Sequence, residues 1–155
     1  MPITIDINED LALHVIRLEG AVSFDELSEL GRLHQTRPDL AAADAVHIVD
    51  EAADLSKLTP DHIDAMRSHY RDVQRAIDFH VVRRAAWICP SPRAWKLGEY
   101  WVAHRHSRDG QGTEICLVAD LADAAALFSP EELAAVRARQ GFVEFARIEG
   151  AAGAV

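Results

Sequence analysis

Residues 45–77 read AVHIVDEAADLSKLTPDHIDAMRSHYRDVQRAI, and the strand–helix unit that they predict indicates the class of fold. The apolar run 45–49 predicts a short buried strand. Thr59 is typical of a helix N-cap, Pro60 of the first helical position, and Asp61 suits the positive end of the helix dipole. Apolar side chains then recur at helical spacing, which predicts one continuous apolar face: Ile63, Met66, Tyr70, Val73 and Ile77.

The chain before this unit predicts a hairpin and a helix. Two runs with apolar residues at every second position, 3–7 and 11–18, are joined by a polar turn and predict two paired strands. Ser23 and Glu26 form a capping-box pattern that begins a helix, and Pro38 marks its exit.

The chain after residue 77 continues the alternation of strands and helices. Strands are expected at 83–89 and 114–119, with a helix at about 92–106 between them and an alanine-rich helix at 121–128 after them. This order predicts an α/β fold with a mixed, mostly parallel sheet of about five strands, opened by the hairpin, with helices packed on it.

Two parts of the chain are expected to differ in character. Residues 1–128 are expected to form the α/β domain, and residues 129–155 to add a C-terminal helix and a frayed tail. A second capping-box pattern at Ser129 begins this helix. Its exposed side around Phe142 and Phe145 could supply the self-complementary patch of a homodimer.

Composition excludes several classes of protein. Apolar residues make up 49% of the 155 residues and charged residues 26%, as in a soluble globular protein. No run approaches the roughly 18 apolar residues of a membrane span, and the first residues lack a secretion signal, so a cytoplasmic location is expected. The formal charge of −9 disfavours nucleic acid as a partner. Cys89 and Cys116 lie in apolar runs and are expected to be buried, reduced thiols.

The order of these elements resembles the SpoIIAA-like branch of the STAS superfamily, the bacterial anti-sigma-factor antagonist fold. The resemblance covers roughly residues 3–128 and implies a non-enzymatic regulatory module that docks a protein partner. It rests on a few local features: the hairpin 3–18, Gly20 and Ser23 before the first helix, Ile48-Val49-Asp50, Asp54-Leu55-Ser56 before the second helix, and the strand 85–89 ending in Pro90-Ser91.

The resemblance also implies a switch, because a serine at the start of the helix after the third strand is phosphorylated in the antagonist proteins. The matching region is 54–62, where Ser56 and Thr59 carry the hydroxyls and Asp61 would lie near a phosphate on Thr59. The family's Asp-Ser-Ser-Gly-like motif is not present there. As an N-cap, Thr59 also has a structural role that contributes about 1 kcal/mol.

The sequence lacks the patterns of known metal and catalytic sites. His104 and His106 are two apart, so they diverge on a helix, and no His, Cys or carboxylate spacing typical of zinc is present. We therefore expect no metal and no cofactor. An enzyme of unrecognised type stays open as an alternative, in which a cleft would gather Asp50, His62 and Arg93.

The segment 93–101 is unusual because two tryptophans and a tyrosine fall within seven residues. Trp95 and Trp101 either cover the sheet or, with Tyr100, form a surface for a partner or an apolar ligand. In the second case Arg93 and Lys96 would flank the surface.

Two functional hypotheses follow. The first is a STAS-like protein-interaction module, and the second is a binder of a small apolar or lipid-like ligand held between the aromatic helix and the sheet. The candidate surface for ligand or partner comprises Asp50, Ser56, Thr59, Asp61, His62, Arg93, Trp95, Lys96, Tyr100 and Trp101.

Overall fold

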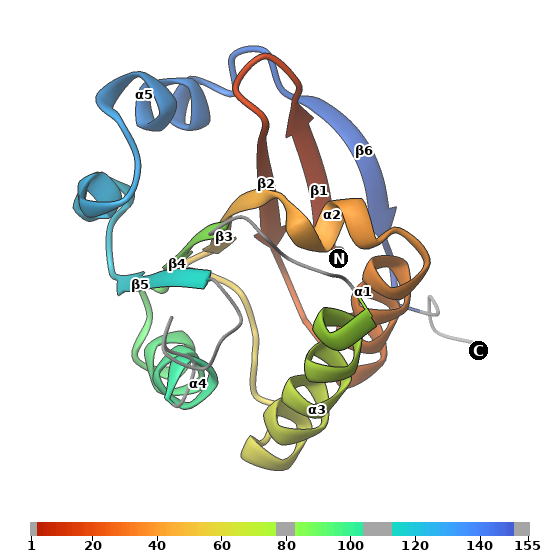
Figure 1. Cartoon of the computed structure of the whole chain (residues 1–155). Helices are drawn as coiled ribbons and strands as arrows, with labels where there is room; N and C mark the ends of the chain where they lie inside the picture. Colours follow the sequence, from red (N-terminus) through yellow and green to blue (C-terminus); the bar gives the residue numbers. More distant parts are fainter. Residues whose placement is uncertain (1–2, 77–82, 104–112, 151–155) are drawn as a thin grey trace.

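The computed structural model describes residues 3–76, 83–103 and 113–150 (Figure 1). Strands and helices alternate along most of the chain. The elements are β1 (Ile3–Asn8), β2 (Leu13–Leu18), α1 (Phe24–Thr36), α2 (Pro38–Ala42), β3 (Asp44–Val49), α3 (Pro60–Ala76), β4 (Arg83–Ile88), α4 (Pro92–Val102), β5 (Thr113–Val118), the 3-10 helix η2 (Leu121–Ala126), α5 (Pro130–Ala138) and β6 (Val143–Ile148).

The described strands form one mixed sheet in the order β5-β4-β3-β2-β1-β6. Strands β2, β3, β4 and β5 pair in parallel with one another, whereas β1 pairs antiparallel with both β2 and β6. The predicted fold class is therefore confirmed: an α/β fold with a mostly parallel sheet opened by a hairpin. The sheet has six strands, one more than the sequence predicted.

The additional strand is β6, and it corrects the prediction of a helix around Phe142 and Phe145. Helix α5 begins at the predicted capping box but ends at Ala138. Arg139 and Gly141 then have φ of +54° and +77°, and these left-handed residues turn the chain back toward the sheet. A Cβ at Gly141 would lie 2.7 Å from Asn8 Nδ2, so a side chain there would prevent this close approach to β1. Residues 143–148 consequently pair with β1 as an edge strand.

Helices cover both faces of the sheet because its strands are apolar on both sides. Helices α1, α3 and α4 pack on one face, which we call the helix face, while η2 and α5 cover the other (Figure 1). Along β4 the side chains alternate: Trp87 belongs to the core of the helix face, and Ala86 and Ile88 to the opposite core. This two-sided burial is typical of parallel sheets connected by helices.

Pro38 shows a smaller difference from the sequence prediction. It was expected to end the first helix, but α1 ends at Thr36 and Pro38 is the first residue of the short helix α2. Proline suits that position because a first helical residue needs no backbone N–H donor.

Arg84 connects three segments on the face opposite the helix face. Its guanidinium bonds the carboxylate of Asp44 at the start of β3, the carbonyl oxygen of Leu127 and the carboxylate of Glu132 on α5, at 2.8–3.0 Å. The guanidinium also lies over the ring of Phe128, 4.6 Å from its centroid. Its hydrogen bond to Glu132 holds the pKa of that carboxyl below its ordinary value of 4.5.

We expect Arg84→Met to lower the free energy of unfolding by about 2 kcal/mol at pH 7, because charged hydrogen bonds at a half-buried site are lost. Since the folded pKa of Glu132 is lowered, its stabilising contribution is present above pH 4.5 and is lost as the pH falls through the lowered value. Urea unfolding from pH 7 to pH 3 measures both effects.

The matched control is Arg147→Met, because Arg147 pairs with Glu144 at an exposed position on β6. We expect a smaller loss of stability for this variant. Equal losses for the two variants would contradict the structural role of Arg84.

Candidate functional site

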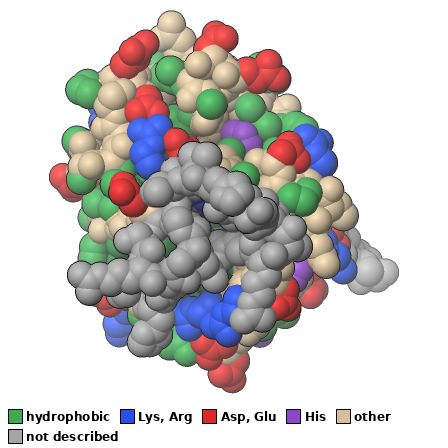
Figure 2. All heavy atoms as spheres, viewed as in Figure 1, with side chains coloured by type: hydrophobic (Ala, Val, Ile, Leu, Met, Phe, Trp, Pro, Cys, Tyr) green, Lys and Arg blue, Asp and Glu red, His purple; other side chains and the backbone are tan. Residues whose placement is uncertain are grey.

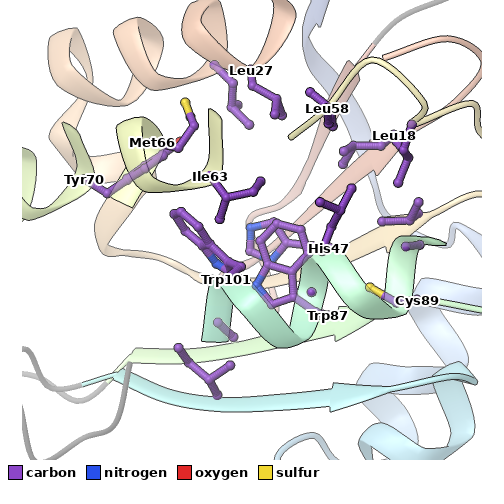
Figure 3. Close-up of a pocket in the computed structure, with 18 of the residues that line it drawn as sticks. Leu18, Leu27, His47, Leu58, Ile63, Met66, Tyr70, Trp87, Cys89 and Trp101 are labelled. Atoms are coloured by element: carbon purple, nitrogen blue, oxygen red, sulfur yellow. The ribbon is translucent and has the colours of Figure 1, made fainter. Parts of the chain in front are cut away.

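A cavity of about 100 Å³ lies between the sheet and helices α1, α3 and α4 (Figure 3). Its walls are mainly aliphatic and aromatic. Figure 3 shows Ile63 of α3 next to Trp101 and Trp87, with Tyr70 and Cys89 on opposite sides of the cavity. The aromatic and polar residues that line it include His34, His47, Tyr70, Arg83, Trp87 and Trp101.

Aromatic rings form much of the wall. His47 on β3 and Trp87 on β4 are register partners. Their rings stack with centroids 4.1 Å apart and an angle of 3° between the ring planes. Trp101 of α4 packs edge-on against both Trp87 and Tyr70, with centroids 6.1 and 5.8 Å apart. These rings come from β3, β4, α3 and α4, so the wall exists only when the four elements pack together.

Gly98 sets the distance between α4 and the sheet. A Cβ at this position would lie 2.8 Å from Leu117 Cδ1 and 3.2 Å from Cys89 Sγ. A larger residue would require the side chains of Leu117 and Cys89 to shift, so Gly98 permits the close packing of α4 on the sheet.

Polar groups gather at the end of the cavity where β4 begins. His34 of α1 is buried, and its Nδ1 lies 2.5 Å from the hydroxyl of Tyr70 on α3. Burial, followed by the charge of Arg83, lowers the pKa of His34 to about 3, so its ring is neutral at pH 7. Arg83 donates from Nη1 to the carbonyl oxygen of Ala41, at 2.8 Å.

Cys89 lies just after β4, and thus at the other end of the cavity. Burial raises the pKa of its thiol to about 12, so the thiolate is scarcely populated at pH 7. Burial also raises the pKa of Cys116. Neither thiol has the activated state that a nucleophilic cysteine needs.

The structure brings only one of the predicted site residues, Trp101, into the lining of the cavity. Trp95 is half-buried and packs against the core of the helix face, as the simpler of the two interpretations expected. Tyr100 is 36% exposed, and its hydroxyl donates to the carboxylate of Asp64 on α3 at 2.8 Å. Lys96 is exposed.

The remaining predicted residues lie in surface loops and at the start of α3, except for Arg93 in the first turn of α4. Asp50, Ser56, Thr59 and Asp61 are exposed. The amide nitrogen of His62 donates to Thr59 Oγ1 at 3.3 Å, which confirms Thr59 as the helix cap. The ring of His62 stacks on Phe24 at 4.6 Å.

Asp50, His62 and Arg93, which an unrecognised enzyme was expected to gather in one cleft, make no hydrogen bonds to one another among the described residues. Asp50 accepts from the amide of Ala52, and Arg93 donates to the carbonyl oxygen of Leu58. The ring of His62 accepts from the amide of Thr59. Each of these polar side chains therefore bonds a backbone group nearby.

Sequence reasoning missed His34, His47 and Arg83. The signal for Arg83 was available, because Arg83, Ala85 and Trp87 alternate along β4 and share one face. His34 lies on α1 and His47 on β3, and nothing in either local pattern indicates that the two residues meet at one cavity.

Among the described residues, no three His, Cys, Asp or Glu side chains are grouped so that they could hold a metal ion. His104 and His106 lie outside the described residues. No helix in the described part of the chain is long and apolar enough to cross a membrane. On the face in Figure 2, acidic side chains are interspersed with basic ones.

Comparisons with protein-family models, with curated proteins and with solved structures each find no match for this chain.

We expect His34 to make stability depend on pH. Its folded pKa is about 3 against an ordinary 6.5, so between these values the unfolded chain binds a proton that the folded protein does not. Its contribution is complete above pH 6.5 and is lost as the pH falls, by up to about 1.4 kcal/mol per pH unit.

His34→Gln should therefore show a smaller loss of stability between pH 7 and pH 5 than the wild-type protein. Urea unfolding at each pH measures this slope. The pKa of His14 is also lowered by burial and contributes to the slope in both proteins, so the comparison isolates His34. Equal slopes would contradict the assignment.

Proposed function

We propose that this protein binds a small apolar ligand in the cavity beneath α3 and α4. The carrying observation is the cavity itself: a partly open space of about 100 Å³ lined by aromatic and aliphatic side chains with a few polar groups at one end. Well-packed interiors contain few spaces larger than a water molecule, whereas ligand sites combine apolar walls with a small number of polar groups.

The size of the cavity sets the size of the ligand. An engineered apolar cavity of roughly 150 Å³ takes up benzene and stays dry when empty. The cavity here, at about 100 Å³, is smaller than that one, so the apolar body that it holds is no larger than about one aromatic ring or a short alkyl chain. The aromatic wall of Trp87 and Trp101 suits either body.

The order of elements supports the resemblance to the SpoIIAA-like branch of the STAS superfamily. The hairpin β1–β2 is followed by α1, β3, α3, β4, α4 and β5, as that resemblance implies. We propose this relationship on the order of elements alone. In this proposal the cavity lies between the helices and the parallel part of the sheet.

Ala85→Leu tests ligand binding by filling the cavity, because Ala85 lines it from β4. With toluene and indole as probes, we expect the affinity to fall at least tenfold, since the added side chain occupies the space that the probe needs. Isothermal titration gives the affinity for both probes, and for toluene the fluorescence of Trp87 and Trp101 also reports occupancy.

The matched control is Ala65→Leu, which makes the same change at an exposed position on α3 and should leave the affinity unchanged. Failure of both probes to bind the wild-type protein would exclude the proposal. Equal affinities for the two variants would place the binding elsewhere.

A second candidate, the protein-interaction module with a phosphorylation switch, is favoured by one surface feature. Ser56 is exposed and shares a surface hollow with Arg93, the other lining residues being Ala53, Asp54 and Leu55. A phosphate on Ser56 would add negative charge beside Arg93 and before the start of α3, where it could be stabilised.

Mass spectrometry of the protein purified from its own host tests this second function. We expect a phosphopeptide that carries the phosphate on Ser56, and Ser56→Ala should remove it, while Ser68→Ala, at an exposed position on α3, should not. An unmodified chain that carries a small molecule would favour the ligand-binding proposal instead.

A further inference from the structure

Among the described residues that line the cavity, Arg83 alone carries a permanent charge. It is the first residue of β4, and strand alternation places its side chain on the same face as Ala85 and Trp87. The adjacent Arg84 has the opposite orientation and bonds Asp44 and Glu132. Two consecutive arginines therefore serve different faces of the sheet, and only Arg84 has carboxylate partners among the described residues.

The guanidinium of Arg83 is incompletely paired. Its Nη1 donates to the carbonyl oxygen of Ala41, while its Nε is buried and has no hydrogen-bond partner within the described part of the chain. No ion pair joins Arg83 to a described carboxylate. Arg83 is half-buried as a residue, and a permanent charge partly withdrawn from water in this way is costly unless it is both paired and hydrogen-bonded.

The carboxylate whose charge acts on Arg83 is that of Asp44, and this carboxylate is engaged by another arginine. Arg84 binds Asp44 at 2.8 Å. Burial lowers the pKa of Arg83, and the charge of Asp44 opposes that lowering without an ion pair between the two side chains. A negative charge paired with Arg83 itself is therefore missing among the described carboxylates.

The neighbouring polar groups do not supply that charge. His34 is neutral at pH 7, and a neutral imidazole bonded to a tyrosine hydroxyl brings no negative charge. Burial, followed by the positive charge of Arg83, lowers the pKa of both His14 and His34. This end of the cavity is thus electropositive, whereas its other walls are apolar.

On the basis of the proposed ligand-binding function, we propose that the ligand is a small carboxylic acid whose apolar body fills the cavity and whose carboxylate accepts hydrogen bonds from Arg83. The planar guanidinium matches a carboxylate in geometry and charge. One negative charge balances one arginine. A phosphate dianion would bring a second negative charge with no second cation among the described lining residues, so the carboxylate is the better fit.

The experiment compares three acids with their neutral amides on the wild-type protein: benzoate, phenylacetate and hexanoate against benzamide, phenylacetamide and hexanamide. Each pair has nearly the same shape and differs mainly in charge. Isothermal titration at pH 7 should show at least one acid binding tenfold or more tightly than its amide, because the charged hydrogen bond forms only with the acid.

Arg83→Met removes the charge and keeps an apolar side chain of similar length. We expect this variant to lose the preference for the acid. Its affinity for the amide should stay within about threefold of wild type, because the variant keeps the apolar contacts of the cavity and lacks only the charge. Arg83→Lys should retain a reduced preference, because lysine keeps the charge without the planar fork.

The matched control is Arg32→Met, the same change at an exposed position on α1, which should leave both affinities unchanged. Circular dichroism confirms that each variant is folded. If Arg83→Met does not fold, the comparison of acids with amides on the wild-type protein and on Arg83→Lys still decides the question.

The possible failures are distinguishable. Equal binding of acid and amide by the wild-type protein, or a preference that survives in Arg83→Met, would overturn the role of Arg83 and leave the ligand-binding function intact. Absence of binding for every acid and amide, together with toluene and indole, would overturn both.

Discussion

The stacked rings of His47 and Trp87 are the contact on which the helix face depends. They come from parallel strands β3 and β4 in register, so two flat, bulky rings lie side by side on the sheet. Trp101 of α4 meets Trp87 edge-on, and Tyr70 of α3 meets Trp101 in the same way. Helices that pack over such rings touch them through further large side chains, and the space left between these side chains is the cavity.

The same constraint explains where the polar groups of the interior lie. His34 and Tyr70 satisfy each other across α1 and α3, and burial keeps His34 neutral. Arg83 cannot become neutral in this way, because a guanidinium keeps its proton at every physiological pH. An apolar interior that accommodates neutral imidazoles still leaves the charge of Arg83 without a described carboxylate partner. The packing of the helix face thus neutralises His34 but not Arg83, and in our proposal the remaining positive charge determines which ligand the cavity suits.

Much of the fold was predictable because its signals are local. The alternation at Ile3 and Ile5 and the capping pattern at Ser23 depend on near neighbours in sequence, as does the helix cap at Thr59. The strand β6 was missed because it forms only through pairing with β1, which is more than 130 residues away in sequence. The capping pattern at Ser129 correctly predicted the start of α5, but the predicted helix was extended beyond its observed end at Ala138.

The site could be predicted only in part, and the reason is physical. Local patterns of apolar spacing, caps and strand alternation determined the class of fold, the order of the elements and the presence of Trp101 on a helix that covers the sheet. Only the tertiary structure decided that Trp101, Tyr70, His34 and Arg83 meet around one cavity, because these residues lie on four different elements. The burial of a side chain and the pairing of its charge depend on all the residues around it in space, whereas the local sequence names only its neighbours along the chain.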